Sequence, residues 1–272
     1  MRGLLPISAA LLALGLSAVS AAQAELSGRD RFPQLRGLSG LSGAGFGVLA
    51  NGRPSFKGAM AYSTPIGHTL GGWSLAAGAG TISKNQTPVF FTTGNLDKTR
   101  GNGTSFFVAG LDLGPVGSLA GGFTFLSGLG DNISTLQFSP LAKGPVQWSL
   151  GCQDLGGSAG SSGEKQPGDD RTSRSFFGAV TYEVQEGVYA TGGIGTRRFQ
   201  KGFASLSGNL GNNFKALAEF DGFGLNYGIA YSPGALGRFS VPDLDMTKIP
   251  EITLFLGMVK GRYATLSLVA SF

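Results

Sequence analysis

The sequence predicts an all-β protein whose antiparallel strands close into a transmembrane barrel. Three observations support this prediction: an N-terminal export signal, a long series of short alternating segments, and a C-terminal strand with one apolar face. We expect about fourteen strands, with twelve as the alternative, because single-chain bacterial barrels favour even strand numbers.

The first 24 residues have the features of a cleaved signal peptide. A basic head containing Arg2 precedes an apolar run at 4–19, and Ala22-Gln23-Ala24 forms a small-residue cleavage site. After residue 24, no apolar run reaches the ~20 residues that a membrane-spanning helix needs. An exported chain that enters a membrane without such helices must form a closed barrel. We therefore expect it in the outer membrane of a Gram-negative-type bacterium.

The composition excludes several other classes of protein. The chain has 47 glycines and 20 phenylalanines, and only 14% of its residues are charged. These glycines lie within alternating apolar runs, which disordered chains lack. No dense Lys/Arg cluster supports nucleic-acid binding. The single cysteine, Cys152, cannot form an internal disulfide, and we interpret it as a packed strand residue.

Residues 25–50 form a lead-in to the predicted barrel, which we place at 51–272. The lead-in could be a periplasmic segment, a plug of the lumen or a first strand. Its G-x-x-G spacings do not make a phosphate loop, because no Lys-Ser/Thr pair and no helical pattern follow. Asn51-Gly52 is a strong hairpin signal and begins the series of strands.

The alternating segments give thirteen clear strands and one short ambiguous strand at 89–91. Their lengths suit a tilted membrane crossing by a β-strand. The clear segments are 54–63, 72–83, 104–113, 118–127, 134–141, 146–153, 174–184, 188–197, 203–209, 214–220, 223–231, 252–260 and 261–272.

Short turns alternate with longer loops along the predicted barrel. Counting back from a periplasmic C-terminus places the polar loop 156–172 outside the cell. The same count places the turns 114–117, 143–145 and 185–187 in the periplasm, where barrel turns are short.

The last strand separates its side chains into two faces. Five apolar residues share the predicted lipid-facing side, and hydroxylated residues dominate the other. This ending resembles the C-terminal strand of bacterial outer-membrane barrels, which implies recognition by the barrel-assembly machinery. The residues that carry this resemblance are Phe272, Ala270, Leu268 and Leu266.

Charged residues are the candidates for a functional lumen. Alternation in the segment 214–220 directs Lys215 and Glu219 inward, because a charge facing lipid would cost about 2–4 kcal/mol. We expect Arg197, Arg198 and Lys201 at the adjoining outer rim. These charges could select an anionic solute. A network that fills the barrel interior is the interpretation we favour.

Two stretches resemble the YjbH-type outer-membrane proteins. The first is 193–199, and the second is 215–231, which contains an A-E-F-D-G … N-Y-G-I-A-Y hairpin. Phe220 stands where that family usually has Tyr. The lead-in also resembles the family's opening, without its proline. The resemblance implies a transport-related or structural role in exopolysaccharide production or export, with polysaccharide-export proteins as partners.

We weigh three functions for such a barrel. The envelope role comes first, a passive small-solute channel second and a lipid-modifying enzyme a distant third. The only histidine, His68, falls in a predicted short connection, and Ser63 is the nearest preceding serine. A Ser–His pair needs an orienting third group, which the sequence does not offer. We predict no enzymatic activity, no cofactor and no metal, and contacts with outer-membrane lipid and lipopolysaccharide.

Overall fold

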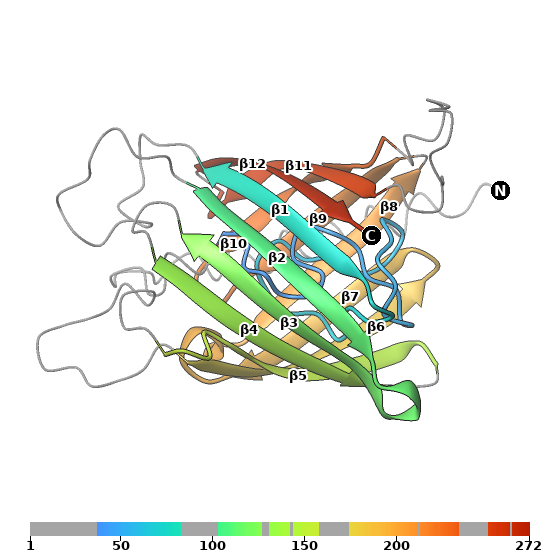
Figure 1. Ribbon diagram of the computed structural model, residues 1–272. Coiled ribbons are helices and arrows are strands. Elements are labelled where there is room, and N and C mark those ends of the chain that lie inside the picture. The colour runs from blue at the N-terminus through green and yellow to red at the C-terminus, as the bar shows by residue number, and fades with distance from the viewer. Residues whose placement is uncertain are drawn as a thin grey trace, which may run out of the picture.

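The computed structural model is a closed antiparallel barrel with a filled lumen (Figure 1). Each strand pairs with its neighbours in sequence, and β1 closes the ring against β12. The structure describes residues 37–82, 103–126, 131–141, 144–157, 174–211, 213–233, 250–261 and 263–272.

Twelve strands form the barrel. Their bounds are β1 (Leu75–Ile82), β2 (Gly103–Asp112), β3 (Gly117–Leu126), β4 (Asp131–Pro140), β5 (Val146–Gln153), β6 (Ser175–Gln185), β7 (Val188–Gly195), β8 (Phe203–Gly211), β9 (Phe214–Phe220), β10 (Leu225–Tyr231), β11 (Glu251–Val259) and β12 (Tyr263–Ser271). Two short 3₁₀ turns, η4 (Gly114–Val116) and η5 (Arg197–Phe199), lie in connections.

The antiparallel barrel predicted from the sequence is confirmed, but the preferred count of fourteen strands is wrong. The barrel begins at Leu75 rather than near residue 51, and the predicted strand 54–63 is not part of its wall. Residues 44–61 pair with one another only through isolated bridges. The ambiguous strand predicted at 89–91 and the predicted signal peptide at 1–24 lie outside the described residues. No helix in the described ranges is long and apolar enough to cross a membrane.

The two ends of the barrel are distinct. We call the end where Phe272 lies the C-terminal mouth; the pairing order also places η4 and the β4–β5 and β6–β7 turns there. The other end, the opposite mouth, holds η5 and the β5–β6 connection. The turns predicted to share one end therefore do so. The ends of β5 and β6 that the predicted loop 156–172 joins lie at the other end, and most of the loop itself lies outside the described residues.

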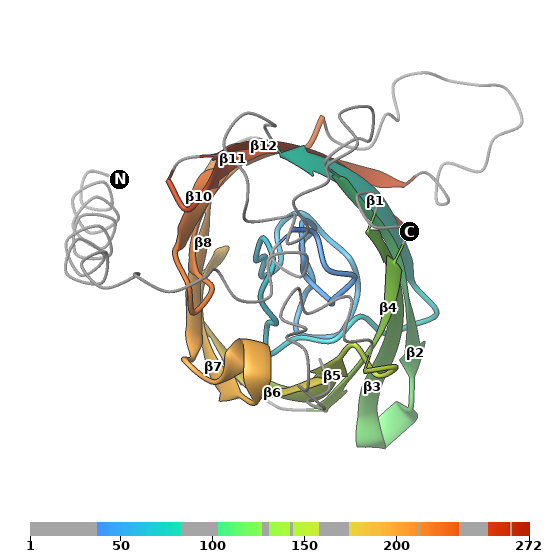
Figure 2. The ribbon, with the colours of Figure 1, turned by 90° about the vertical axis from the view of Figure 1, so that its left-hand side faces the viewer.

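Residues 37–74, here called the lumen segment, run inside the barrel. Figure 2 looks into the opposite mouth and shows this blue-to-cyan chain surrounded by the strands. Gly37 and residues 62–64 contact the wall towards the opposite mouth. Phe56 and Gly71 contact it at the C-terminal mouth. The segment therefore crosses the lumen three times.

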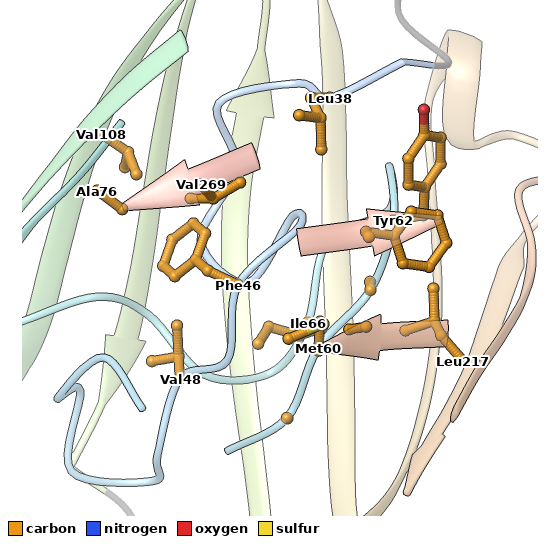
Figure 3. Close-up of a cluster of buried hydrophobic side chains, with 14 of the residues drawn as sticks. Leu38, Phe46, Val48, Met60, Tyr62, Ile66, Ala76, Val108, Leu217 and Val269 are labelled. Carbon is orange, nitrogen blue, oxygen red and sulfur yellow. The ribbon is translucent and has the colours of Figure 1, made fainter. Parts of the chain in front are cut away.

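Apolar side chains attach the lumen segment to the wall, and Figure 3 shows one cluster of them. Burial of such side chains stabilises the packed state by about 1.5–3 kcal/mol each. The segment contributes Leu38, Phe46, Val48, Met60, Tyr62 and Ile66, and the wall contributes Ala76, Val108, Leu217 and Val269 among others.

Glycine allows the segment to approach the wall closely. A Cβ at Gly110 of β2 would lie 2.4 Å from the carbonyl carbon and oxygen of Leu70. Real Cβ atoms do not approach backbone atoms so closely, so this contact requires glycine. By contrast, a Cβ at Gly121 of β3 would meet no atom within 4 Å.

We predict that Gly110→Ala lowers the free energy of unfolding by about 1–3 kcal/mol, because the added methyl overpacks the interface with the lumen segment. Gly121→Ala is the matched control, since it adds the same methyl to a strand facing open space. Urea unfolding in detergent micelles, followed by tryptophan fluorescence, measures both. Equal effects of the two substitutions would show that the close contact at Gly110 carries no energy.

Candidate functional site

Both apolar and polar side chains line the lumen. Strands β1–β3 and β9–β12 supply most of the apolar inward side chains, including Phe106, Phe255 and Val269. Strands β4–β8 present uncharged polar groups at their inward positions. The buried members of this polar set are Thr135, Gln137, Ser139, Gln147, Ser149, Gln153, Ser175, Thr181, Thr191, Ser205 and Ser207.

Glu219 of β9 is the centre of the contact between wall and segment. Its buried carboxylate accepts hydrogen bonds from the backbone N–H groups of Tyr62 (2.9 Å), Ser63 (2.9 Å) and Thr64 (3.1 Å). The hydroxyls of Ser63 and Thr64 also donate, at 2.8 and 2.9 Å, and so does the Asn226 amide at 2.9 Å. Charge-assisted hydrogen bonds of this kind are stronger than neutral ones.

Arg198 in η5 holds the same turn of the segment from the other side. One guanidinium nitrogen donates to the Ser63 carbonyl at 2.9 Å, and another donates to the Gln153 side chain at 2.5 Å. Arg198 lies at the mouth that the sequence predicts for it, but its side chain is fully buried there. β7 ends at Gly195, and the following turn directs the side chain into the lumen.

The other two predicted rim cations lie farther out at the same mouth. Lys201 is exposed, with its Nζ 5.4 Å from the centroid of the Phe223 ring. Arg197 is half-buried and has a left-handed backbone, with φ of 51°. The structure therefore separates the predicted trio into one buried contact residue and two outer residues.

Lys215, also on β9, contacts the segment nearer the C-terminal mouth. Its ammonium group donates to the Gly58 carbonyl and lies 5.6 Å from the ring centroids of both Phe56 and Tyr189. Close by, the Glu251 carboxylate accepts a hydrogen bond from the Phe56 backbone at 2.7 Å. Lys215 and Glu219 thus face inward as the alternation predicts, and each binds the lumen segment.

Most polar contacts of the wall go to the main chain of the segment. Thr181 accepts from the Gly67 N–H at 2.8 Å, and Ser207 accepts from the Met60 N–H at 3.2 Å. Because the irregular segment has little sheet or helix of its own, its buried peptide groups need such partners. The wall side chains take the place of a neighbouring strand.

Several of these residues were not singled out from the sequence. Gln137, Ser149, Thr181 and Ser207 are uncharged, and they occupy inward positions of strands whose pattern is otherwise ordinary. The only sequence signal for these residues is strand alternation, which predicts that they face inward, as Glu219 does. Nothing in the sequence indicated that a chain segment would meet them there.

His68 lies inside the lumen rather than in a connection at the membrane surface. Its Nδ1 is 2.7 Å from the Val48 carbonyl oxygen, and its ring meets Tyr189 edge-on at 5.8 Å between centroids. Since a carbonyl can only accept, Nδ1 carries the hydrogen of this bond. Burial lowers the pKa of His68, while the Val48 hydrogen bond and Glu183 act in the opposite direction.

Among the described residues, no group of three or more His, Cys, Asp or Glu side chains is placed to hold a metal ion. Cys152 is a free thiol buried on β5, as its strand context predicts. No protein-family model and no curated protein matches this chain.

Removing the Glu219 carboxylate should release the middle of the lumen segment. Glu219→Ala leaves three buried N–H groups without an acceptor, so we predict a loss of about 3 kcal/mol or more in unfolding free energy. Glu219→Gln keeps one oxygen and should lose less. Glu186→Ala, in the exposed β6–β7 turn, is the control and should stay within about 0.5 kcal/mol of the unsubstituted protein. Urea unfolding and protease cleavage within residues 37–74 report the result.

Acidification should loosen the lumen segment through His68. The unfolded chain binds a proton near pH 6.5, whereas the folded protein binds it only at lower pH. Stability is therefore lost as the pH falls below about 6.5, by at most about 1.4 kcal/mol per pH unit. His68→Asn should remove this loss between about pH 6.5 and 5. An unchanged pH dependence in that variant would assign the loss to other groups.

Proposed function

We propose that this protein is an outer-membrane β-barrel, closed at rest by its own N-terminal segment, with a structural or transport-related role in envelope polysaccharide production or export. The observation that carries the membrane assignment is the outward face of the barrel. Outward side chains are apolar all around the barrel, whereas the charged side chains of the strands point inward.

The outward side chains suit lipid and not water. Phe176, Ile194 and Leu256 are 55%, 64% and 64% exposed, which would be unfavourable over so wide an area in water. Every charged strand residue with a described side chain occupies an inward position of the alternation. These residues are Asp112, Glu183, Lys215, Glu219 and Glu251.

Amphipathic aromatics support an interface at the C-terminal mouth. Trp148, Tyr182 and Tyr231 point outward near this end of β5, β6 and β10, and Trp73 is exposed just before β1. Such residues favour the boundary between lipid and water. This arrangement agrees with a periplasmic C-terminus, and it offers the last strand to the barrel-assembly machinery.

The filled lumen favours an accessory or gated barrel over a passive channel. A passive channel needs a continuous water path, but the lumen segment is buried along its three passes. The envelope role itself rests on the resemblance of 193–199 and 215–231 to YjbH-type proteins. Lipopolysaccharide and polysaccharide-export proteins are the partners that this role implies.

A lipid-modifying enzyme receives no support from the position of the histidine. Such an enzyme would need His68 beside a serine at the lipid-facing rim. Instead His68 is buried in the lumen against Val48 and Tyr189.

Planar-bilayer conductance tests the proposal. We expect the refolded mature chain to insert without steady conductance, and deletion of 25–70 to produce an open pore. Heat-shifted gel mobility verifies that both proteins are folded. Steady conductance from the mature chain would support the passive channel instead, and failure of the folded protein to enter vesicles would overturn the membrane assignment.

A further inference from the structure

The regular strand pairing of the barrel wall is shortest between β4 and β5. Their pairing covers four residue pairs and ends at Phe138–Leu150, whereas the other described neighbours pair over five to ten. Both strands nevertheless extend towards the C-terminal mouth. We call this stretch, residues 139–140 of β4 and 146–149 of β5, the β4–β5 seam.

Side chains replace part of the strand pairing at the seam. Pro140 has no backbone N–H to donate. The Ser139 hydroxyl donates to the Trp148 carbonyl at 2.8 Å, so a side chain spans the gap that a backbone bond would otherwise close. A side-chain bond of this kind is easier to rearrange than a continuous ladder.

The lumen segment binds both edges of the seam from inside. From β4, the Gln137 amide donates to the carbonyls of Ile66 (2.8 Å) and His68 (3.2 Å). From β5, the Ser149 hydroxyl donates to the same Ile66 carbonyl at 2.7 Å. One short stretch of main chain therefore connects two strands that pair poorly with each other.

Gly67 allows this stretch to lie flat against the wall. Its carbonyl oxygen lies 3.2 Å from the Ser139 hydroxyl, whose single hydrogen goes to the nearer Trp148 carbonyl. A Cβ at Gly67 would lie 2.4 Å from the Gln147 carbonyl oxygen and 2.6 Å from the Thr181 nitrogen. Any larger residue must push residues 66–68 away from the seam.

The two sides of the seam differ in chemistry. Inside, Gln137, Gln147 and Ser149 offer amide and hydroxyl groups without a charge. Outside, the flanking side chains are apolar and exposed: Leu136, Leu141, Val146, Trp148 and Leu150. A molecule lying across the seam would meet uncharged hydrogen-bonding groups at one end and lipid-facing apolar groups at the other.

We propose that the β4–β5 seam is a lateral opening between lumen and bilayer, kept shut by residues 66–68, for an amphiphile with acyl chains and an uncharged, hydroxyl-bearing head group. The head group would bind the inner amides and hydroxyls, and the acyl chains would stay in the membrane. This inference rests on the membrane function proposed above and specifies the class of molecule that the barrel handles.

Paired spin labels test the opening in the full mature chain with Cys152→Ser. One pair replaces Phe138 and Leu150, the last paired residues beside the seam, and the control pair replaces Phe107 and Phe123, which pair across β2 and β3. We expect Gly67→Val to lengthen the seam distance by roughly one strand spacing, ~5 Å, and to leave the control unchanged. An unchanged seam distance in folded, inserted barrel would overturn the inference and leave the membrane proposal standing.

Brominated lipids test the class of ligand. A bimane label at Gln147→Cys, again with Cys152→Ser, reports from inside the seam and leaves the Ser149 hydrogen bond to Ile66 in place. In Gly67→Val, we expect several-fold stronger quenching by galactosyl diacylglycerol with brominated acyl chains than by phosphatidylcholine with the same chains. In the protein that keeps Gly67, neither lipid should quench the bimane fluorescence. Equal quenching by both lipids, or quenching by aqueous bromide alone, would overturn the assignment of an uncharged head group.

Discussion

The structure depends on one requirement: the buried peptide groups of the lumen segment must find hydrogen-bond partners. A chain that crosses a closed lumen three times with little regular structure cannot supply them itself. Three charged side chains of the wall meet the most demanding part of this need. Glu219 and Arg198 bind the segment towards the opposite mouth, and Lys215 binds it nearer the C-terminal mouth. The hydroxyl and amide groups of β4–β8 meet much of the rest. The inward chemistry of the wall is therefore matched to a polypeptide main chain.

Strand alternation made much of this architecture predictable. It located the strands from β2 to β12 within a few residues, and it directed Lys215 and Glu219 inward. It also separated the two faces of the last strand. Alternation is informative here because the outward face of the wall is apolar and the inward face meets the buried main chain of the lumen segment, so polar and apolar residues cannot exchange positions without cost.

The same signal failed where a buried segment imitates a strand. Residues 54–63 alternate apolar and small or polar groups, but their apolar side chains face the inside of the wall. A sequence does not distinguish an apolar residue that meets lipid from one that meets the lumen of its own barrel. The extra predicted strand follows from this ambiguity. The burial of Arg198 was not predictable from alternation, because the turn η5 reverses the direction that a continued β7 would give its side chain.

The attachment of the lumen segment to β1 has a consequence for the order of folding. The ring closes only when β1 pairs with β12, which follows all the other strands in the sequence. The lumen segment, which precedes β1, thus gains its complete enclosure from the strand farthest from it in the sequence. Until then, Phe46, Met60 and Ile66 have no complete wall to pack against. The lumen segment therefore reaches its final packing only when the first and last strands of the barrel meet.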